Sequence, residues 1–396
     1  GTLQIGTGGN GTLAQSSNTI VNNANLVYSM DLTNTGTASL ASSITGTGNL
    51  TATGKLVNIN GNITQSGNVN LTGSNVLGAS SFISGVNLVN ANTTITAGNI
   101  TLTGDMGRTT NGGSLTLDTS ATNGAITLNA SFGRSSQWWG INTLTANAGT
   151  GAVTLSGANF ANGWGAGGVA AFDTNLTGTL NIASNISSTG AINLTAAGNS
   201  TVTGALTLGT NSASTWTVNP GLTMNASGIL AGSNASLTKN GTGTLTLSGT
   251  NTYSGTTTIN AGTLQIGGAG QLGSGTYSQN ITNNGTFLYA STANQTLSGI
   301  ISGTGALTKN GTGTLTLSGA NTYNGTTTIN AGTLALGANQ ALGAIAGTGN
   351  ISLSSFNLTT TASSNTTLSG VITGTTAGFT KAGNGTLTLS GAANTW

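Results

Sequence analysis

Apolar and small polar residues alternate along most of this 396-residue chain. The segments GTLTLSG (243–249), TTTINAG (256–262) and GTLQIG (262–267) show the pattern, with Leu or Ile separated by Thr, Asn or Gln. A period of two residues is typical of a β-strand that buries one face. Gly, Asn and Ser clusters between these segments favour turns. The pattern therefore predicts short strands throughout and no helix, because Thr, Asn, Ser and Gly are poor helix formers.

A long internal repeat organises the second half of the chain. Residues 237–267 and 307–337 are nearly identical and lie 70 positions apart, and a third copy covers 379–396, where it stops in mid-repeat. We interpret 70 residues as three coils of about 23 residues each, within the usual range for structural repeats.

The repeat carries its own polar signature. Lys239, Lys309 and Lys381 occupy the same position of the three copies. We expect them to be solvated turn residues that discourage lateral pairing of sheets. Asn260 and Asn330 recur at strand ends, where ladders of their side chains could satisfy turn carbonyls.

The first half of the chain contains similar strand-like segments, which repeat less exactly. Its strand-like segments share a glycine, a β-branched residue, then Thr or Asn, then Leu; they are residues 61–73, 98–107, 124–133, 151–160 and 190–198. Strands this short cannot bury a face alone, but they can do so when stacked on one another. We therefore predict an all-β protein, a right-handed parallel β-helix forming a single elongated rod. Diverged coils are expected over 1–220 and repeat coils over 221–396.

Composition removes several classes of function. Only 3% of the residues are charged, and there is no Cys and no His, so a Ser-His-Asp triad, a thiol nucleophile and an ordinary zinc site are excluded. A net charge of +2 leaves little with which to neutralise nucleic-acid phosphates. No apolar run approaches the ~18 residues of a membrane-spanning helix. We predict no cofactor, no metal, no nucleic-acid partner and no membrane insertion by this chain.

The acidic residues are Asp31, Asp105, Asp118 and Asp173. Some parallel β-helices use paired carboxylates in a groove to bind Ca²⁺ or for acid–base chemistry. Asp105 and Asp118, with Arg108 nearby, could lie on adjacent coils. The scatter of the four residues along the chain favours turn capping instead, and we predict that the protein is not an enzyme.

Aromatic residues gather near 131–173. Arg134, Trp138, Trp139 and Trp164 lie in SFGRSSQWWG and NFANGWG. These side chains could form a contact surface for glycans or proteins, with Arg134 in a cation–π contact. Alternatively, the loops fold over the β-helix as a local hydrophobic plug.

The two ends of the chain match parts of the repeat. Residues 1–6 read GTLQIG, identical to 262–267, and the last residues read SGAANTW. One interpretation is that a boundary fell inside a longer repeat array. The other is head-to-tail stacking of copies through open β-helix ends, with Gly1, Thr2, Leu3, Thr386, Leu387 and Trp396 as the candidate contacts.

The phrase KNGTGTLTLSGTNTYSGTTTINAGTLQIG at Lys239–Gly267 resembles the autotransporter-associated β-strand repeat, also called the passenger-associated transport repeat. It recurs at Lys309–Gly337 and is cut short after Lys381. The first half resembles, more loosely, haemagglutinin-like β-helices of secreted bacterial adhesins. The resemblance implies a passenger of type V secretion, exported through the periplasm of a Gram-negative bacterium to its surface or surroundings. A separate outer-membrane barrel is then expected in the precursor. The absence of Cys agrees with export as a threaded chain.

Together these observations predict a non-enzymatic, surface-exposed or released β-helical passenger with a structural or adhesive role. Its partners would be glycans or proteins of host or bacterial surfaces. The alternative is a filament or matrix subunit that stacks head-to-tail on its own copies. A polysaccharide-active β-helix enzyme is the third possibility.

Overall fold

A computed structural model describes residues 2–5, 11–13, 19–29, 37–40, 42–54, 56–59, 62–73, 85–88, 93–103, 106–108, 114–129, 143–148, 152–156, 171–175, 180–183, 185–188, 190–196 and 198–396. The chain divides into two compact units, Gly1–Gly209 and Thr210–Trp396. Among the described residues there is no α-helix, and one short 3₁₀ turn, η1 (Gly273–Gly275), interrupts the strands.

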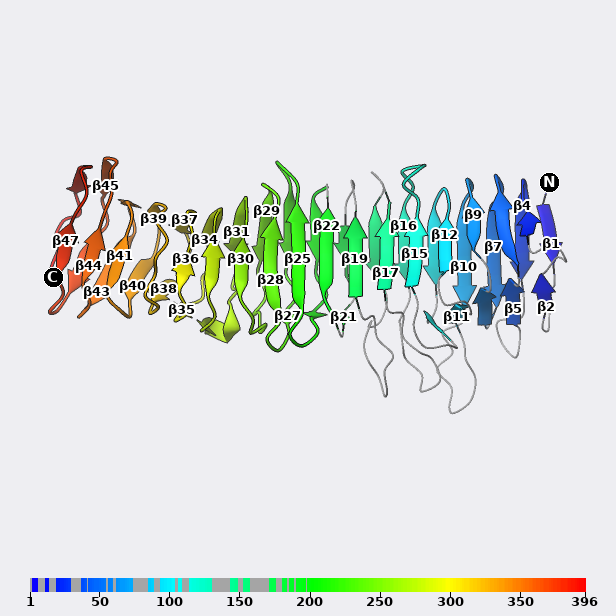
Figure 1. Cartoon of the computed structure of the whole chain (residues 1–396), viewed down its shortest axis with the longest axis horizontal. Helices are drawn as coiled ribbons and strands as arrows, with labels where there is room; N and C mark the ends of the chain where they lie inside the picture. The colour runs from blue at the N-terminus through cyan, green and yellow to red at the C-terminus, as the bar shows by residue number, and fades with distance from the viewer. Residues whose placement is uncertain are drawn as a thin grey trace. The chain divides into compact units, whose positions relative to one another are not determined.

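Unit 1 is built from ladders of parallel strands (Figure 1). The first ladder contains β1 (Thr2–Ile5), β4 (Asn25–Ser29), β7 (Asn49–Gly54), β10 (Val69–Gly73), β13 (Ile100–Thr103), β16 (Ile126–Asn129), β18 (Val153–Ser156), β20 (Leu180–Ile182) and β23 (Ser200–Val202). The second contains β2 (Gly11–Leu13), β5 (Thr37–Leu40), β8 (Leu56–Ile59), β11 (Gly85–Leu88) and β14 (Met106–Arg108). The third contains β3 (Thr19–Val21), β6 (Ser43–Gly46), β9 (Ile63–Gln65), β12 (Thr93–Thr96), β15 (Ser114–Asp118), β17 (Thr143–Asn147), β19 (Ala171–Asn175) and β22 (Ile192–Ala196), while β21 (Ile186–Ser187) pairs with β24 (Leu206–Thr207).

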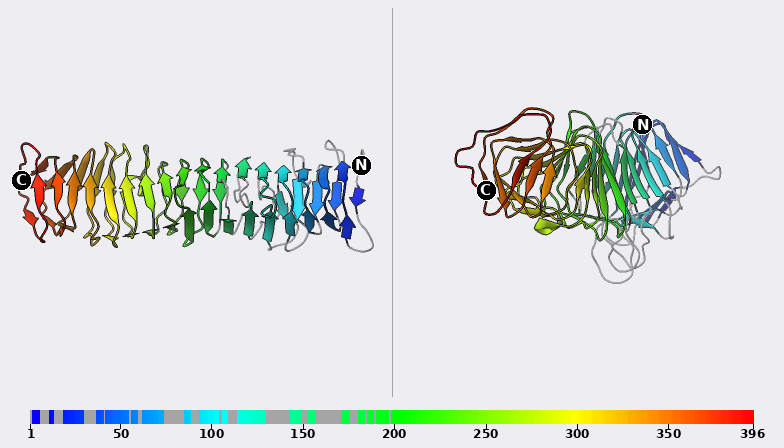
Figure 2. Two further views of the ribbon diagram at one scale, coloured as in Figure 1. Left: turned by 90° about the horizontal axis from the view of Figure 1, so that it is seen from above. Right: turned by 60° about the vertical axis from the view of Figure 1, so that its left-hand side comes forward.

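Unit 2 has the same construction, and Figure 2 shows its strands stacked coil on coil. We name its sheets by their first strand. The β25 sheet contains β25 (Ala213–Val218), β28 (Ser236–Asn240), β30 (Thr257–Ile259), β33 (Ile281–Asn283) and β36 (Ile301–Ser302). The β26 sheet contains β26 (Thr223–Ala226), β29 (Thr244–Leu247), β31 (Thr263–Ile266), β34 (Thr286–Tyr289), β37 (Ala306–Lys309), β39 (Thr327–Ile329), β42 (Ile345–Gly347), β45 (Thr366–Leu368) and β48 (Leu387–Leu389). The β32 sheet contains β32 (Thr276–Tyr277), β35 (Gln295–Leu297), β38 (Thr314–Leu317), β40 (Thr333–Leu336), β43 (Asn350–Ser354) and β46 (Ile372–Gly374); the β41 sheet contains β41 (Gln340–Leu342), β44 (Leu358–Thr360) and β47 (Phe379–Lys381); β27 (Leu230–Ala231) is a further short strand.

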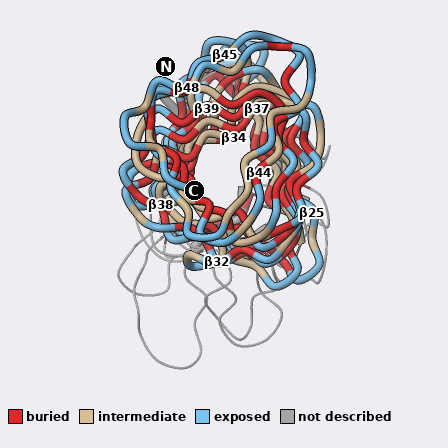
Figure 3. Tube along the Cα trace, turned by 90° about the vertical axis from the view of Figure 1, so that its left-hand side faces the viewer, coloured by how far each residue is buried: buried red, intermediate tan, exposed pale blue. Residues whose placement is uncertain are grey.

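The strands bury one face, as their alternation predicts. In β29 the side chains of Leu245 and Leu247 are fully buried, while Thr244 and Thr246 are half-exposed. Parallel, in-register pairing places buried Leu50 beside Val69 in unit 1, and Val69 in turn pairs with Ile100. Figure 3 shows buried positions alternating with exposed ones along the trace. Like residues therefore stack from coil to coil, and the predicted parallel β-helix is confirmed.

The predicted length of a coil is wrong. Along the β26 sheet Thr244 pairs with Thr263, Thr263 with Thr286, and Thr286 with Ala306. Three coils thus take 62 residues (306 − 244), whereas the sequence repeat is 70 residues long. The repeat is longer than three coils, so successive copies cannot fall on the same face.

The three copies of the repeat consequently occupy three different sheets. Leu237 of the first copy lies in β28 of the β25 sheet. The equivalent Leu307 lies in β37 of the β26 sheet, and Phe379 lies in β47 of the β41 sheet. The repeat therefore encodes a local stacking arrangement that is compatible with any face of the coil.

Candidate functional site

The two halves of each complete repeat lie on top of one another. In the first copy the first half (237–249) forms β28 and β29, and the second half (256–267) forms β30 and β31 on the next coil. Leu237 pairs with Thr257 and Lys239 with Ile259, while Leu247 pairs with Ile266. The repeat is therefore a stacked pair of half-coils. Its two halves are paired strand on strand across successive coils.

The second copy repeats this arrangement on other sheets. Its first half (307–319) forms β37 and β38, and its second half (326–337) forms β39 and β40. Leu307 pairs with Thr327 and Lys309 with Ile329. The same sequence thus makes the same stacking contacts in two different positions around the coil.

A lysine fastens the two halves together. The Nζ of Lys239 donates hydrogen bonds to the carbonyl oxygens of Asn240 (2.8 Å), Gly241 (2.7 Å) and Ala261 (3.3 Å). Asn240 is the last residue of β28 and Gly241 begins the turn after it, whereas Ala261 lies in the second half on the next coil. The side chain of Lys239 has no solvent exposure. One ammonium group therefore hydrogen-bonds both to backbone carbonyls close to it in sequence and to a carbonyl of the next coil.

Lys309 has the corresponding position in the second copy. Its Nζ donates to the carbonyl oxygens of Gly311 and Ala331, the latter at 3.1 Å, and the side chain is fully buried. It also lies 5.7 Å from the centre of the Tyr289 ring, within the range of a cation–π contact. In both complete copies, the equivalent lysine is therefore buried against the equivalent turn.

The prediction of solvated lysines is wrong for these two copies. Turn carbonyls converge where successive coils stack, and an ammonium group satisfies several of them at once. Burial lowers the pKa of Lys239 and of Lys309 to about 8, so both remain largely protonated at neutral pH. The sequence contained a signal for burial, because Lys239 is two positions from buried Leu237 and thus on the same face of the strand.

Polar groups are also buried between the coils. Asn251 accepts a hydrogen bond from the amide of Leu230 at 3.0 Å, and its Nδ2 donates to the carbonyls of Gly249 (2.8 Å) and Gln271 (3.1 Å). The side chain is fully buried. A single amide therefore links three stretches of backbone on neighbouring coils.

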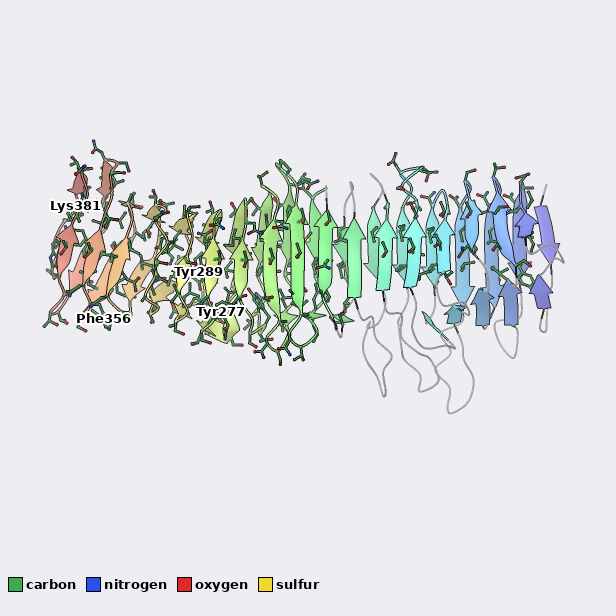
Figure 4. The ribbon with its side chains drawn as sticks, viewed as in Figure 1. Tyr277, Tyr289, Phe356 and Lys381 are labelled. Atoms are coloured by element: carbon green, nitrogen blue, oxygen red, sulfur yellow. The ribbon has the colours of Figure 1, made fainter. Side chains whose placement is uncertain are left out.

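Tyrosine hydroxyls join this network. Tyr253 shares a hydrogen bond of 2.7 Å with Thr257, and Thr257 shares one of 2.8 Å with Tyr277 (labelled in Figure 4). Burial raises the pKa of Tyr253 to about 12, although the bonds to Thr257 and Tyr277 oppose that shift. In the second copy Tyr323 and Thr327 make the equivalent bond at 2.8 Å. Buried hydroxyls thus join each second half to the segment that precedes it, and in the first copy Tyr277 extends the network to the next coil.

The asparagine ladder exists, with other partners than predicted. Asn260 Nδ2 donates to Asn240 Oδ1 at 2.8 Å, and Asn330 Nδ2 donates to Asn310 Oδ1 at 2.8 Å. These bonds join side chains rather than satisfying turn carbonyls. They lie on the exposed surface, where two amides spaced one coil apart can face each other.

The third copy, residues 379–396, corresponds to the first half of the repeat. Leu387 and Leu389 are half-exposed, whereas Leu245 and Leu247 at the same positions of the first copy are fully buried. Among the described residues, β47 pairs only with β44, and β48 only with β45.

Two further side-chain contacts belong to the third copy. Lys381 Nζ donates to the carbonyls of Ala382 (2.6 Å) and Gly383 (3.0 Å) in its own turn, and the side chain is half-exposed (Figure 4). The ring of Phe379 lies 5.6 Å from that of Trp396, which is 44% exposed.

The other residues predicted to form contacts are placed only in part. Arg134, Trp138, Trp139, Trp164 and Gly1 lie outside the described residues, so their roles stay predictions. The backbone of Thr2 and Leu3 pairs with that of Asn25 and Leu26 in β4, and their side chains lie outside the description. Thr386 is exposed beside the half-exposed Leu387.

Asp118 caps a turn. Its Oδ1 accepts hydrogen bonds from the amide (2.9 Å) and hydroxyl (2.6 Å) of Ser120, which confirms turn capping at this position. Asp31 and Asp105 lie outside the described residues, as does the side chain of Asp173. In the described part of the chain no group of three or more His, Cys, Asp or Glu could hold a metal ion.

The stacked halves coincide with a known repeat family. The model of the passenger-associated-transport-repeat matches residues 237–266, 307–336 and 379–396. These matches cover both complete stacked pairs and the third copy, on a parallel β-solenoid. These repeats and the β-solenoid architecture support an autotransporter passenger domain.

The repeats of this passenger imply a secreted or surface-exposed protein of a Gram-negative bacterium. The search of curated proteins and that of solved structures find no significant match. The described part of the passenger contains no helix with the length and hydrophobicity needed to span a membrane.

Proposed function

We propose that this passenger is a non-enzymatic structural and adhesive protein that attaches to glycans or proteins of host or bacterial surfaces. A ladder of uncharged polar side chains on the first ladder of unit 1 supports the proposal. Register pairs Thr51 with Asn70, Asn70 with Thr101, Thr101 with Thr127, and Thr127 with Thr154. All five are half-exposed, and each directly follows a buried residue.

The ladder suits a repetitive, uncharged partner. Strands in a sheet lie about 4.8 Å apart, so the hydroxyl and amide groups recur at that interval along the ladder. Hydroxyls and amides donate and accept hydrogen bonds without requiring a charged partner. Many weak contacts in a row add avidity when a polymer or surface presents repeated groups. The ladder therefore favours attachment to glycans through many small contacts.

The experiment compares two matched triple variants. In the first, Thr101, Thr127 and Thr154 are each replaced by Lys; in the control, Thr276, Thr296 and Thr316 of the β32 sheet are replaced in the same way. Beads coated with purified passenger are tested for retention on surfaces bearing bacterial or host glycans. We expect the first variant to lose retention and the control to keep it. Equal retention by both variants would contradict the proposal for this ladder, and hydrolysis of the glycans would contradict a non-enzymatic role.

A second candidate is a filament or matrix subunit that stacks head-to-tail. In the structure the strand TLQI of β31 pairs with TLTL of β29, so Leu264 lies beside Leu245. The strand β1 has the same sequence, TLQI, and β48 belongs to the same TLTL type as β29. The pairing supports contact between β1 of one copy and β48 of another. Electron micrographs over a range of concentrations test it: rods that lengthen with concentration are expected, and rods of constant length would exclude it.

A further inference from the structure

We propose that unit 1 carries a second binding activity, toward the surface of ice. The site is the outward side of β7, β10 and β13, which we call the threonine face; it consists of Thr51, Thr53, Asn70, Thr72, Thr101 and Thr103. The inference goes beyond attachment to glycans and does not rest on it, because the partner is the crystal lattice of water and not a sugar polymer.

Parallel pairing arranges these residues in two columns. The first column runs from Thr51 through Asn70 to Thr101, and the register continues it through Thr127 to Thr154. The second column lies two residues further along each strand. Successive side chains in a column come from successive coils, so they recur at the constant spacing of a parallel sheet.

The second column consists of Thr53, Thr72 and Thr103, which pair in register. All three side chains are half-exposed, and each follows a buried residue. Within the described part of the chain, the hydroxyl groups of Thr72 and Thr103 form no hydrogen bond to the protein. These hydroxyls are therefore available to water molecules on the outer side of the sheet.

The threonine face holds its hydroxyl groups in nearly fixed positions. Threonine is β-branched, so its χ1 angle is restricted. Beneath the face, fully buried Leu71 pairs with fully buried Leu102 and anchors the two strands. Figure 1 shows the strands of unit 1 lying side by side in nearly the same direction. A surface that is rigid before binding loses little conformational entropy when it meets a crystal.

The spacing along each column is close to a repeat of ice. Neighbouring strands lie about 4.8 Å apart. Water oxygens joined by a hydrogen bond are about 2.8 Å apart, and tetrahedral geometry then places second neighbours in ice about 4.6 Å apart. The difference of about 0.2 Å per coil adds up to about 0.8 Å over the four intervals from Thr51 to Thr154. The columns themselves are about 6.7 Å apart, so the match to ice is closest along the ladder.

The threonine face is uncharged, which separates it from the other threonine-bearing sheet of unit 1. In the third ladder Thr94 pairs with Thr116, but Thr96 pairs with Asp118. The side chain of Asp118 is half-exposed, and an ionised carboxylate loses favourable hydration when it is pressed against a neutral surface. The outward positions of the threonine face contain only Thr and Asn. Ice, which is neutral and periodic, is therefore matched by the threonine face and not by the third ladder.

The test is capture of the intact passenger by growing ice. Ice is grown slowly on a cold surface from a dilute solution that contains the passenger and an inert soluble protein. A growing ice front excludes solutes that do not bind to it. We expect the passenger to be enriched in the ice and the inert protein to remain in the liquid. Exclusion of the passenger to the same extent as the inert protein would overturn the proposal.

Two matched double variants locate the effect. Thr72→Tyr with Thr103→Tyr raises two rings above the threonine face, which prevents close contact with a flat crystal. The control, Thr94→Tyr with Thr116→Tyr, makes the same changes on paired strands of the third ladder, where both side chains are also half-exposed. We expect the first variant to be excluded from ice and the control to be captured like the unmodified chain. Equal capture of the two variants would contradict the assignment to the threonine face.

The unfolding midpoint shows whether each variant is folded. If the tyrosine variant of the threonine face does not fold, Thr72→Ser with Thr103→Ser takes its place. Serine keeps the hydroxyl but lacks the methyl group that restricts χ1, so we expect capture to fall, and undiminished capture would overturn the proposal. Retention on glycan surfaces is measured in liquid buffer above the freezing point, so a failure of glycan attachment and a failure of ice binding are separate results.

Discussion

The Nζ of Lys239 lies 3.3 Å from the carbonyl oxygen of Ala261, a residue 22 positions later on the next coil. A buried charge normally destabilises a protein unless hydrogen bonds compensate for the lost hydration. Here the ammonium group donates to three carbonyls, two from its own turn and one from the coil above. The charge is therefore tolerated only where two coils are stacked, which makes the lysine a link between them.

Loss of this link should destabilise the passenger where a coil covers the lysine. Lys309→Met leaves the carbonyls of Gly311 and Ala331 without their donor. A buried polar group without a partner costs about 1–3 kcal/mol, and we expect the free energy of unfolding to fall by about that amount. Lys381→Met should have a smaller effect, because the carbonyl partner Gly383 is exposed to water. Urea denaturation of the two variants measures the difference, and equal stability losses would contradict this role of burial.

The buried lysines and tyrosines should make stability depend on alkaline pH in two opposite ways. The pKa of Lys239 and Lys309 is about 8 in the folded chain against 10.5 when exposed. Between those values the unfolded chain binds more protons, so the stability rises with pH. The pKa of Tyr253 is about 12 in the folded chain against 10.0 when exposed. Above pH 10 the folded chain therefore binds more protons at this group, and stability falls.

Thermal unfolding between pH 7 and pH 11 measures this profile. We expect the midpoint to rise from pH 8 toward pH 10 and to turn downward above it. The double variant Lys239→Gln with Lys309→Gln should lose the rising part and keep the fall. A rising part of the same size in that variant would assign it to other groups.

Glycine at the lysine turn should be irreplaceable for a steric reason. Gly332 has φ = +67°, and a Cβ built there would lie 2.5 Å from the carbonyl oxygen of Gly311 and 2.7 Å from Nζ of Lys309. Gly221 has a similar φ of +75°, and a Cβ there would have no atom within 4 Å. Both Gly→Ala variants place an alanine in the left-handed backbone conformation, which destabilises the folded chain by about 1–2 kcal/mol. We expect Gly332→Ala to lose clearly more stability than Gly221→Ala by denaturant unfolding, and the opposite order would refute the clash.

Trp138 and Trp139 could form a contact surface or a hydrophobic plug, and these two roles predict different effects of substitution. If Trp138 and Trp139 form a contact surface, replacing both by Ala weakens retention on glycan or protein surfaces and leaves the unfolding midpoint unchanged. If they form a hydrophobic plug, the midpoint falls, because each buried aromatic side chain contributes several kcal/mol. Binding and thermal unfolding of the same double variant separate the two. Unchanged values in both assays would rule out each role.

The alternation of Leu and Ile with Thr was sufficient to predict strands, and the repetition was sufficient to predict stacking. Leu245 and Leu247 are buried and Thr246 faces out, as a period of two requires. The turn cap at Asp118 also followed from residue type. These features are local, since they depend on neighbouring residues of one strand or one turn.

The sequence by itself determined that this chain forms strands, that their apolar faces stack, and that a repeat of passenger type occupies its second half. Only the tertiary structure decided how long a coil is, and therefore that the three copies of the repeat occupy three different sheets. The tertiary structure also decided that Lys239 and Lys309 are buried. A charged residue at a turn is expected in water, but the carbonyl of Ala261 reaches Lys239 only after the next coil has stacked. Whether a charge is buried depends on which distant backbone group covers it, and no local pattern specifies that.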